Sequence, residues 1–200
     1  MPKVNTVLGA IAPTEMGGTL SHVHLTLDIL CWYAEPQDPE LAKLAAKPLC
    51  LENLGLARRN GLMVRDNLVQ NDVELTIREV REFARAGGKT FVDMELPGIG
   101  RDVAALQRIS RATGVQVIAS TGFYTQSSHP PEVAKLDVGA LADGMVREIE
   151  VGIGTTSVKA GNIGEIGCSG MPDMACLPDE EKVLRAAARA QARTGASLTV

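Results

Sequence analysis

Residues 71–121 read NDVELTIREVREFARAGGKTFVDMELPGIGRDVAALQRISRATGVQVIAST, and this stretch indicates the fold class of the chain. It holds a helical pattern, a strand, a second helical pattern and a second strand, in that order. The first helical pattern begins at Asn71, with Glu74 as its capping-box partner, and ends at Gly87. The second is capped by Asp102 and ends at Gly114. The apolar positions of the first pattern recur at helical spacing: Val73, Ile77, Val80 and Ala84.

The same alternation continues on both sides of this stretch. A third helical pattern covers Val138–Ile149 and precedes Gly152, and a fourth starts at Asp179, after Pro178, and ends at Gly195. Strands that alternate with helices at this spacing predict a parallel sheet with the helices packed outside it. The expected strands are Thr19–Leu25, Thr90–Leu96, Val115–Thr121, Ser157–Ile166 and Ala196–Val200.

A parallel α/β chain either forms an open, doubly wound sheet or closes into a barrel. A dinucleotide-binding sheet would carry GxGxxG after its first strand, but the nearest run, Gly98–Val103, follows the second strand and lacks the third glycine. We interpret this run as a tight turn into the next helix. A closed barrel typically needs ~250 residues and eight strands, whereas this chain has 200 residues and five expected strands. We therefore predict a TIM-type (β/α)8 barrel, with residues 1–200 as the N-terminal part of a single domain truncated after strand five.

Composition and charge exclude several classes of protein. The net charge is −4 and the pI about 5.4, which gives no support for a basic nucleic-acid-binding face. No apolar stretch approaches the roughly 20 residues that span a bilayer, and the N-terminus lacks the apolar core of a signal peptide. We therefore expect a cytoplasmic protein with reduced thiols, because no CxxC pair joins its four cysteines: Cys31, Cys50, Cys168 and Cys176.

The connection after the first strand is longer than the others. It covers Thr26–Gln70 and contains the single tryptophan, Trp32, followed by Tyr33. A loop of this length usually carries function or forms a small subdomain of its own.

Two histidines at the end of the first strand are candidates for metal ligands. His22 and His24 are two residues apart, so their side chains project from the same face of a strand. That spacing lets two imidazole nitrogens bind one divalent cation, and imidazole is a common ligand of catalytic zinc. The alternative is a pair of surface or core histidines hydrogen-bonded to the backbone.

Two further candidate ligands lie on the fourth expected strand. Lys159 and Glu165 are six residues apart, so both could face the same side, about 20 Å from each other at about 3.3 Å per residue. Only Glu165 can then lie with the histidines at the carboxyl end of the sheet. We expect Lys159 to be solvated at the opposite end. The alternative for Glu165 is an ion-pairing or helix-capping carboxylate.

Four motifs in order give the chain a family resemblance. Gly17–His24 resembles the first-strand metal motif of the phosphotriesterase family, within the amidohydrolase superfamily. Pro97–Asp102 and Thr121–Tyr124 resemble its second and third strand ends. Ala160–Ser169 is similar to the branch called phosphotriesterase-related protein. The resemblance extends from Val7 to Val200.

The resemblance implies a binuclear metal site. In better-known members a carboxylated lysine bridges two metals, whereas in this branch a glutamate does so, which would place that role on Glu165. The resemblance thus implies two divalent ions, with zinc as the expected metal. One ion would be held by His22 and His24, and Glu165 would be shared by both ions. A hydroxide generated there would attack a small-molecule ester, lactone, amide or phosphotriester. The family's remaining ligands, a histidine on each of two later strands and an aspartate on the last, are absent from residues 1–200.

Three further polar residues have open roles. Tyr124 is a candidate catalytic residue, because its hydroxyl could reach the reacting oxygen; the alternative is an amphipathic rim position. His129, in a loop beside prolines, is either exposed or a substrate contact. Asp93 lies within the second strand, where it either orients a histidine ring or forms a structural pair at the bottom of the barrel.

A second hypothesis is a non-catalytic barrel fragment that binds a metal or a partner without turnover. A five-stranded arc leaves two open sheet edges, and its inward face would lose the layers of the missing strands. We assign Val92, Val117 and Leu198 to that inward face. We therefore expect residues 1–200 to be insoluble, molten or rescued as a homodimer, and to bind zinc weakly.

Overall fold

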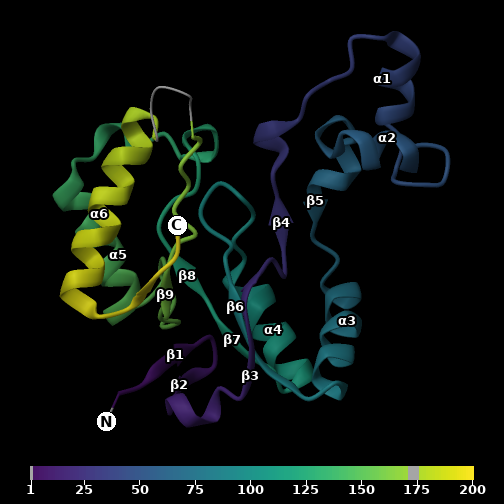
Figure 1. Ribbon diagram of the computed structural model, residues 1–200. Helices are drawn as coiled ribbons and strands as arrows, with labels where there is room; N and C mark the ends of the chain where they lie inside the picture. The colour runs from purple at the N-terminus through teal and green to yellow at the C-terminus, as the bar shows by residue number, and fades with distance from the viewer. Residues whose placement is uncertain (1, 171–175) are drawn as a thin grey trace.

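The computed structural model describes residues 2–170 and 176–200, and parallel strands form its centre (Figure 1). These strands are β3 (Gly18–Val23), β6 (Gly88–Asp93), β7 (Gln116–Ile118), β8 (Ser120–Thr121), β9 (Asn162–Ile163) and β10 (Ser197–Leu198). Their hydrogen-bonded orders are β3-β6-β7 and β8-β9-β10, and every pairing is parallel. Only Ala119 separates β7 from β8, so the described strands follow one another in chain order. A doubly wound sheet would reverse that order, so the arrangement favours part of a barrel.

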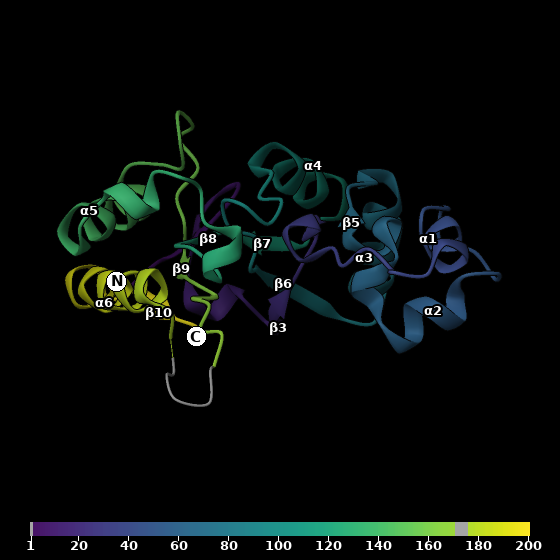
Figure 2. The ribbon, with the colours of Figure 1, turned by 90° about the horizontal axis from the view of Figure 1, so that it is seen from above.

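Helices cover the outside of these strands. They are α3 (Val73–Arg85), α4 (Val103–Thr113), α5 (Val138–Glu150) and α6 (Pro178–Thr194). Figures 1 and 2 show α3 beside α4 on one flank and α5 beside α6 on the other. Among the described residues no helix is both long and apolar enough to cross a membrane. The core between the layers includes Ile77, Phe91, Leu106, Ile109, Val117, Met145, Ile149, Ile163 and Val183.

The ends of the helices follow from specific capping residues. The side chain of Asp102 accepts a hydrogen bond from the backbone N–H of Ala105, which confirms the predicted cap of α4. Gly114 and Gly195 adopt left-handed φ values of 74° and 71° after α4 and α6, so both predicted stops are confirmed.

The predicted N-cap residue of α3 is wrong by one position. Asp72, and not Asn71, caps the helix by accepting a hydrogen bond from the N–H of Leu75. Glu74 pairs with Arg108 of α4, so its carboxylate is used in a contact between neighbouring helices. Either residue is a good N-cap, and the sequence pattern does not distinguish between them.

An N-terminal hairpin packs against the amino-terminal end of the sheet and was not predicted. It consists of β1 (Val4–Thr6) and β2 (Gly9–Ile11), which pair antiparallel, and the short 3-10 helix Pro13–Glu15 follows. Val7, between the two strands, donates its N–H to the carbonyl of Val117 at 2.8 Å. Gln107 of α4 donates to the carbonyl of Val7 at 2.9 Å. The hairpin thus joins the bottom of β7 to a helix outside it.

The fourth and fifth strands are shorter than predicted. Only Asn162–Ile163 of the expected Ser157–Ile166 is strand, and only Ser197–Leu198 of the expected Ala196–Val200. The residues before β9 follow an irregular path, and the side chain of Asn5 donates to the carbonyl of Ala160 at 2.9 Å. A side-chain amide therefore replaces part of the expected ladder.

The long connection after β3 forms a small unit that projects from the sheet (Figures 1 and 2). Its two ends pair as the antiparallel strands β4 (Leu27–Asp28) and β5 (Val69–Gln70). Between them lie α1 (Pro39–Ala45), α2 (Leu54–Arg59) and the 3-10 helices Leu30–Trp32, Gly61–Met63 and Arg65–Leu68. Ala45, Leu56 and Val64 form a separate core there. Two more 3-10 helices, Gln126–Ser128 and Val133–Lys135, precede α5.

The run Gly98–Val103 is the tight turn that we inferred from its sequence. Gly98 has φ +92°, and a Cβ atom there would lie 1.8 Å from the carbonyl oxygen of Ser128. The glycine therefore permits a close approach of two loops at the carboxyl end of the sheet.

Candidate metal centre

Three predicted ligands converge at the carboxyl end of the sheet. His22 lies near the end of β3, His24 follows that strand, and Glu165 follows β9. Glu165 Oε2 is 3.4 Å from His22 Nε2, and Glu165 Oε1 is 3.6 Å from His24 Nε2. The two Nε2 atoms are 3.3 Å apart. The structure thus brings together residues that are separated by more than half of the chain.

These separations suit a divalent ion. Two nitrogens that each lie about 2.0–2.1 Å from one tetrahedral zinc are about 3.3–3.4 Å apart. The two imidazoles match that spacing, and each one faces a different oxygen of Glu165. The side chains are 46%, 29% and 16% exposed for His22, His24 and Glu165, so a ligand can reach them from solvent. The donor set of two imidazoles and a carboxylate fits zinc chemistry.

The backbone before Glu165 is positioned by a glycine. Gly164 has φ +105°, and a Cβ atom there would lie 2.1 Å from the carbonyl oxygen of Thr199. Only a residue without a side chain allows this approach of β9 and the chain after β10. Gly164 N also donates to the carbonyl of Thr121 at 2.7 Å, which fixes the segment on its other side.

Glu95 orients the ring of His24 and was missed from the sequence. Its Oε1 lies 2.7 Å from His24 Nδ1, and the side chain is fully buried. With Nδ1–H donating to Glu95, the Nε2 lone pair of His24 faces His22 and Glu165. The hydrogen bond to Glu95 raises the pKa of His24. Burial raises the pKa of Glu95, while the bond to His24 opposes that shift.

Asp93 takes neither of its two predicted roles. It lies near the carboxyl end of β6, where Oδ2 accepts from Leu25 N at 3.0 Å and Oδ1 from Glu95 N at 3.2 Å. Burial raises the pKa of its carboxyl to about 7, although both N–H donors oppose the shift. Asp93 therefore positions the backbone next to His24 and Glu95, and does not contact an imidazole or pair at the bottom of the sheet.

Tyr124 lies in an aromatic cluster close enough to Glu165 to feel its charge. Its ring is 5.3 Å from that of Trp32, whose indole N–H donates to Ser127 Oγ at 2.7 Å. Burial, and then the charge of Glu165, raise the pKa of Tyr124, so its hydroxyl is a neutral donor at pH 7. The cluster joins the long connection after β3 to the loop after β8.

His129 forms a structural contact in that loop. Its Nε2–H donates to the carbonyl of Tyr124 at 2.8 Å, and its ring packs edge-on against Phe123. Burial lowers the pKa of His129, which keeps the ring neutral. The Nδ1 atom is buried without a hydrogen-bond partner among the described residues.

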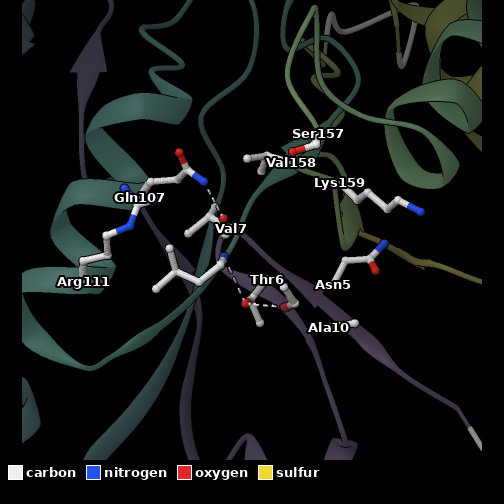
Figure 3. Close-up of a pocket in the computed structure, with 11 residues that line it drawn as sticks. Asn5, Thr6, Val7, Ala10, Gln107, Arg111, Ser157, Val158 and Lys159 are labelled. Atoms are coloured by element: carbon white, nitrogen blue, oxygen red, sulfur yellow. Dashed lines mark hydrogen bonds between the residues drawn. The ribbon is translucent and has the colours of Figure 1, made fainter.

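Lys159 lies at the opposite end of the sheet, as we expected. It is exposed and lines a cavity of about 530 Å³ together with the hairpin residues Asn5–Ala10 and residues of α4. Figure 3 shows its side chain extending away from Gln107 and Arg111. It is therefore not positioned to bridge ions bound by the histidines.

Comparisons with known proteins agree with these features. Residues 2–200 match the model of the phosphotriesterase family. The chain is 39% identical to a phosphotriesterase-related protein of Nematostella vectensis, covering 98% of this chain and 55% of that protein. It is 36% identical to the N-acetyltaurine hydrolase of Homo sapiens, covering 99% of this chain and 56% of that protein.

The fold is also similar to a solved structure. A resiniferatoxin-binding protein from Rhodobacter sphaeroides superimposes with a TM-score of 0.92 at 43% identity, covering 97% of this chain and 53% of that one. The chain spans about half the length of the curated relatives it matches. Because the family model matches nearly every residue, the chain belongs to the phosphotriesterase family.

Proposed function

We propose that the protein is a metal-dependent hydrolase in which His22, His24 and Glu165 hold part of a binuclear zinc site. The observation that supports this most is the spacing of 3.3 Å between the two Nε2 atoms, with a carboxylate oxygen facing each ring. The remaining ligands that the family resemblance implies lie outside this chain. The whole protein would supply them from the later strands of an eight-stranded barrel.

Bound divalent ions would supply an activated water and would polarise the carbonyl or phosphoryl oxygen of a substrate. The residues of this chain have three tasks around them. The ions would be bound by His22, His24 and Glu165, and Glu95 keeps the His24 ring in one tautomer. Trp32 and Tyr124 form an aromatic surface that we place at one side of the site, because the charge of Glu165 acts on Tyr124. The neutral hydroxyl of Tyr124 can donate a hydrogen bond to a substrate oxygen.

An N-acyl amide is our first candidate substrate. The human relative is named for hydrolysis of N-acetyltaurine, and its similarity covers 99% of this chain. Esters, lactones and phosphotriesters are the other classes that the same chemistry would serve. Assays of the whole protein with N-acetyltaurine, an aryl ester, a γ-lactone and a phosphotriester separate these classes, and we expect the amide to give the highest kcat/KM.

The metal site itself is tested by zinc titration against a competing chromogenic chelator. We expect His22→Ala to weaken zinc binding at least tenfold, because it removes one of the three convergent donors. Lys159→Ala is the matched control, since Lys159 lies at the other end of the sheet, and it should leave the affinity unchanged. Equal zinc binding by the wild type and His22→Ala would contradict the proposal, because the histidine pair would then not hold the ion.

A further inference from the structure

A buried carboxylate holds three segments together at the start of α6. Glu180, in the first turn of α6, is fully buried. Its Oε2 accepts from Ser169 N and from Leu177 N, each at 2.9 Å. Its Oε1 accepts from Gln126 N at 3.0 Å and from the hydroxyl of Ser169. One oxygen atom therefore binds the chain after β9 and the residue that precedes α6.

Each of the two residues held by Oε2 directly follows a cysteine. Cys168 precedes Ser169, and Cys176 precedes Leu177. The two sulfur atoms are 2.7 Å apart, and both thiols are free and partly exposed. The backbone hydrogen bonds to Glu180 thus hold the residue that follows each thiol. Cys31 and Cys50 are also free, but they are exposed, whereas Cys168 and Cys176 are only partly exposed.

We propose that Cys168 and Cys176 are a modification site at which a small-molecule disulfide, such as oxidised glutathione, converts the two thiols into a reversible intramolecular disulfide. A disulfide needs the sulfurs at about 2.05 Å, so closure moves them by about 0.7 Å. The buried carboxylate already restrains both attachment points. This assignment is independent of the proposed hydrolase function.

The reaction proceeds by two exchange steps. The Cys176 thiolate attacks one sulfur of oxidised glutathione, which breaks that S–S bond and releases one glutathione thiolate. The Cys168 sulfur, losing its proton, then attacks the Cys176 sulfur of the mixed disulfide and releases the second glutathione. Both cysteines are oxidised, oxidised glutathione is reduced, and the two thiol protons end on two glutathione molecules. Burial, and then the contact with Cys176, raise the pKa of Cys168 to about 11, which agrees with first attack by Cys176.

The disulfide would tie the segment that carries Glu165 to the start of α6. Glu165 lies three residues before Cys168, and Cys176 lies two residues before Pro178, the first residue of that helix. A short closed loop of this kind restricts the unfolded chain. We expect the oxidised protein to unfold about 5–10 °C higher than the reduced protein.

The experiment is incubation of the chain with oxidised glutathione, alkylation of the remaining thiols, digestion and mass spectrometry. We expect a cross-linked peptide pair that joins Cys168 to Cys176, with Cys31 and Cys50 alkylated or carrying single glutathione adducts. Cys168→Ser should trap a stable mixed disulfide on Cys176. Adducts on Cys31 and Cys50 without a cross-link between Cys168 and Cys176 would overturn the proposal.

The contribution of Glu180 is tested separately with Glu180→Gln. An amide can replace only part of the acceptor capacity of the carboxylate, so the two backbone attachment points should separate more often. We expect the cross-link to form at least fivefold more slowly in this variant, with the far-UV circular dichroism unchanged. An unchanged rate would show that Glu180 does not set the spacing of the thiols, and a cross-link that forms in neither protein would overturn the site as a whole.

Discussion

At the residue scale, the two acidic side chains at the carboxyl end of β6 have different roles. Asp93 has both oxygens bound by backbone N–H groups, which is a structural arrangement. Glu95 is fully buried, its Oε1 contacts only the His24 ring, and its Oε2 has no partner among the described residues. A buried carboxylate with an unsatisfied oxygen is costly. The hydrogen bond that orients His24 gives this costly arrangement a role.

Replacement of Glu95 by glutamine tests that explanation. The amide has the same shape, but its NH2 group can donate to Nδ1 and select the other tautomer, in which His24 Nε2 carries the proton. We expect zinc affinity to fall by about 10–100-fold, as is common for such partners of metal-binding histidines. The measurement is a chelator competition, with the tautomer of His24 read from its ¹⁵N chemical shifts. Unchanged shifts and affinity would assign Glu95 a purely structural role.

His22, His24 and Glu165 could be predicted as a group because strand periodicity and sheet topology bring them to one edge. Glu95 could not be identified in the same way. The sequence contains Asp93 and Glu95 at alternate positions of one apolar strand, so both face the same side in an ideal strand. The pairing of β3 with β6 carries a register shift between Leu20 and Val23, and spacing alone reveals neither that irregularity nor the different partners of the two carboxylates.

At the element scale, the start of α6 depends on the ionisation of Glu180. Burial alone would raise its pKa, but hydrogen bonds from Ser169, Gln126 and Leu177 outweigh that effect and lower it to about 2 from 4.5. A depressed carboxyl pKa stabilises the fold above the unfolded pKa, and this contribution is lost as the pH falls from about 4.5 towards 2. About 3 kcal/mol of the free energy of unfolding is involved.

Denaturant unfolding at several pH values measures this contribution. We expect the wild type to lose about 3 kcal/mol more than Glu180→Gln between pH 5 and pH 2, because the amide does not titrate. Other carboxyls titrate equally in both proteins, so the difference isolates Glu180. Parallel stability curves for the two proteins would contradict the assignment.

The unit that contains α1 and α2 should unfold separately from the rest. Its core consists of Ala45, Leu56 and Val64, and Leu51 beside it is 90% exposed. A small core provides little protection against local opening. In hydrogen exchange we expect amides of α1 and α2 to exchange at least tenfold faster than those of α5 and α6.

A pair of truncations gives that measurement a control. Leu56→Ala should lower protection only between residues 39 and 68, because its contacts lie within the unit. Met145→Ala, in the main core, should lower protection throughout the parallel strands and their helices. Equal, global effects of both substitutions would show that the unit and the sheet unfold together.

The helices were predictable as elements because their apolar periodicity and glycine stops are local signals. The N-terminal hairpin was not, because β1 and β2 are only three residues each and are fixed by contacts with Val117 and Gln107. The fourth strand is shorter than its sequence predicts for a related reason. Its residues are apolar enough for a strand, but Asn5 from the hairpin binds the backbone there.

At the scale of the whole molecule, the assignment of Val117 to the inward face is wrong. Val117 pairs in register with Phe91, which stacks on Phe83 of α3, so both side chains face the helices. Leu20 pairs with Phe91 on the other side and shares that face. It is nevertheless 48% exposed, whereas Phe91 is 5% exposed. At the open edge of the described sheet, no packed side chains therefore bury Leu20 as they bury Phe91.

That edge should lead to self-association of the 200-residue chain. Among the described residues β3 is paired only with β6, so its outer side presents unpaired backbone groups next to an exposed leucine. Full burial of a leucine side chain contributes about 1.5–3 kcal/mol, and covering the exposed half of Leu20 about half of that. Leu20→Lys should then weaken association by about 1 kcal/mol, or roughly fivefold. Leu51→Lys is the matched control, because Leu51 is more exposed but lies away from the edge, and it should have no effect. Sedimentation velocity at micromolar concentrations measures all three proteins, and a wild-type chain that is monomeric and unfolds cooperatively would contradict this expectation.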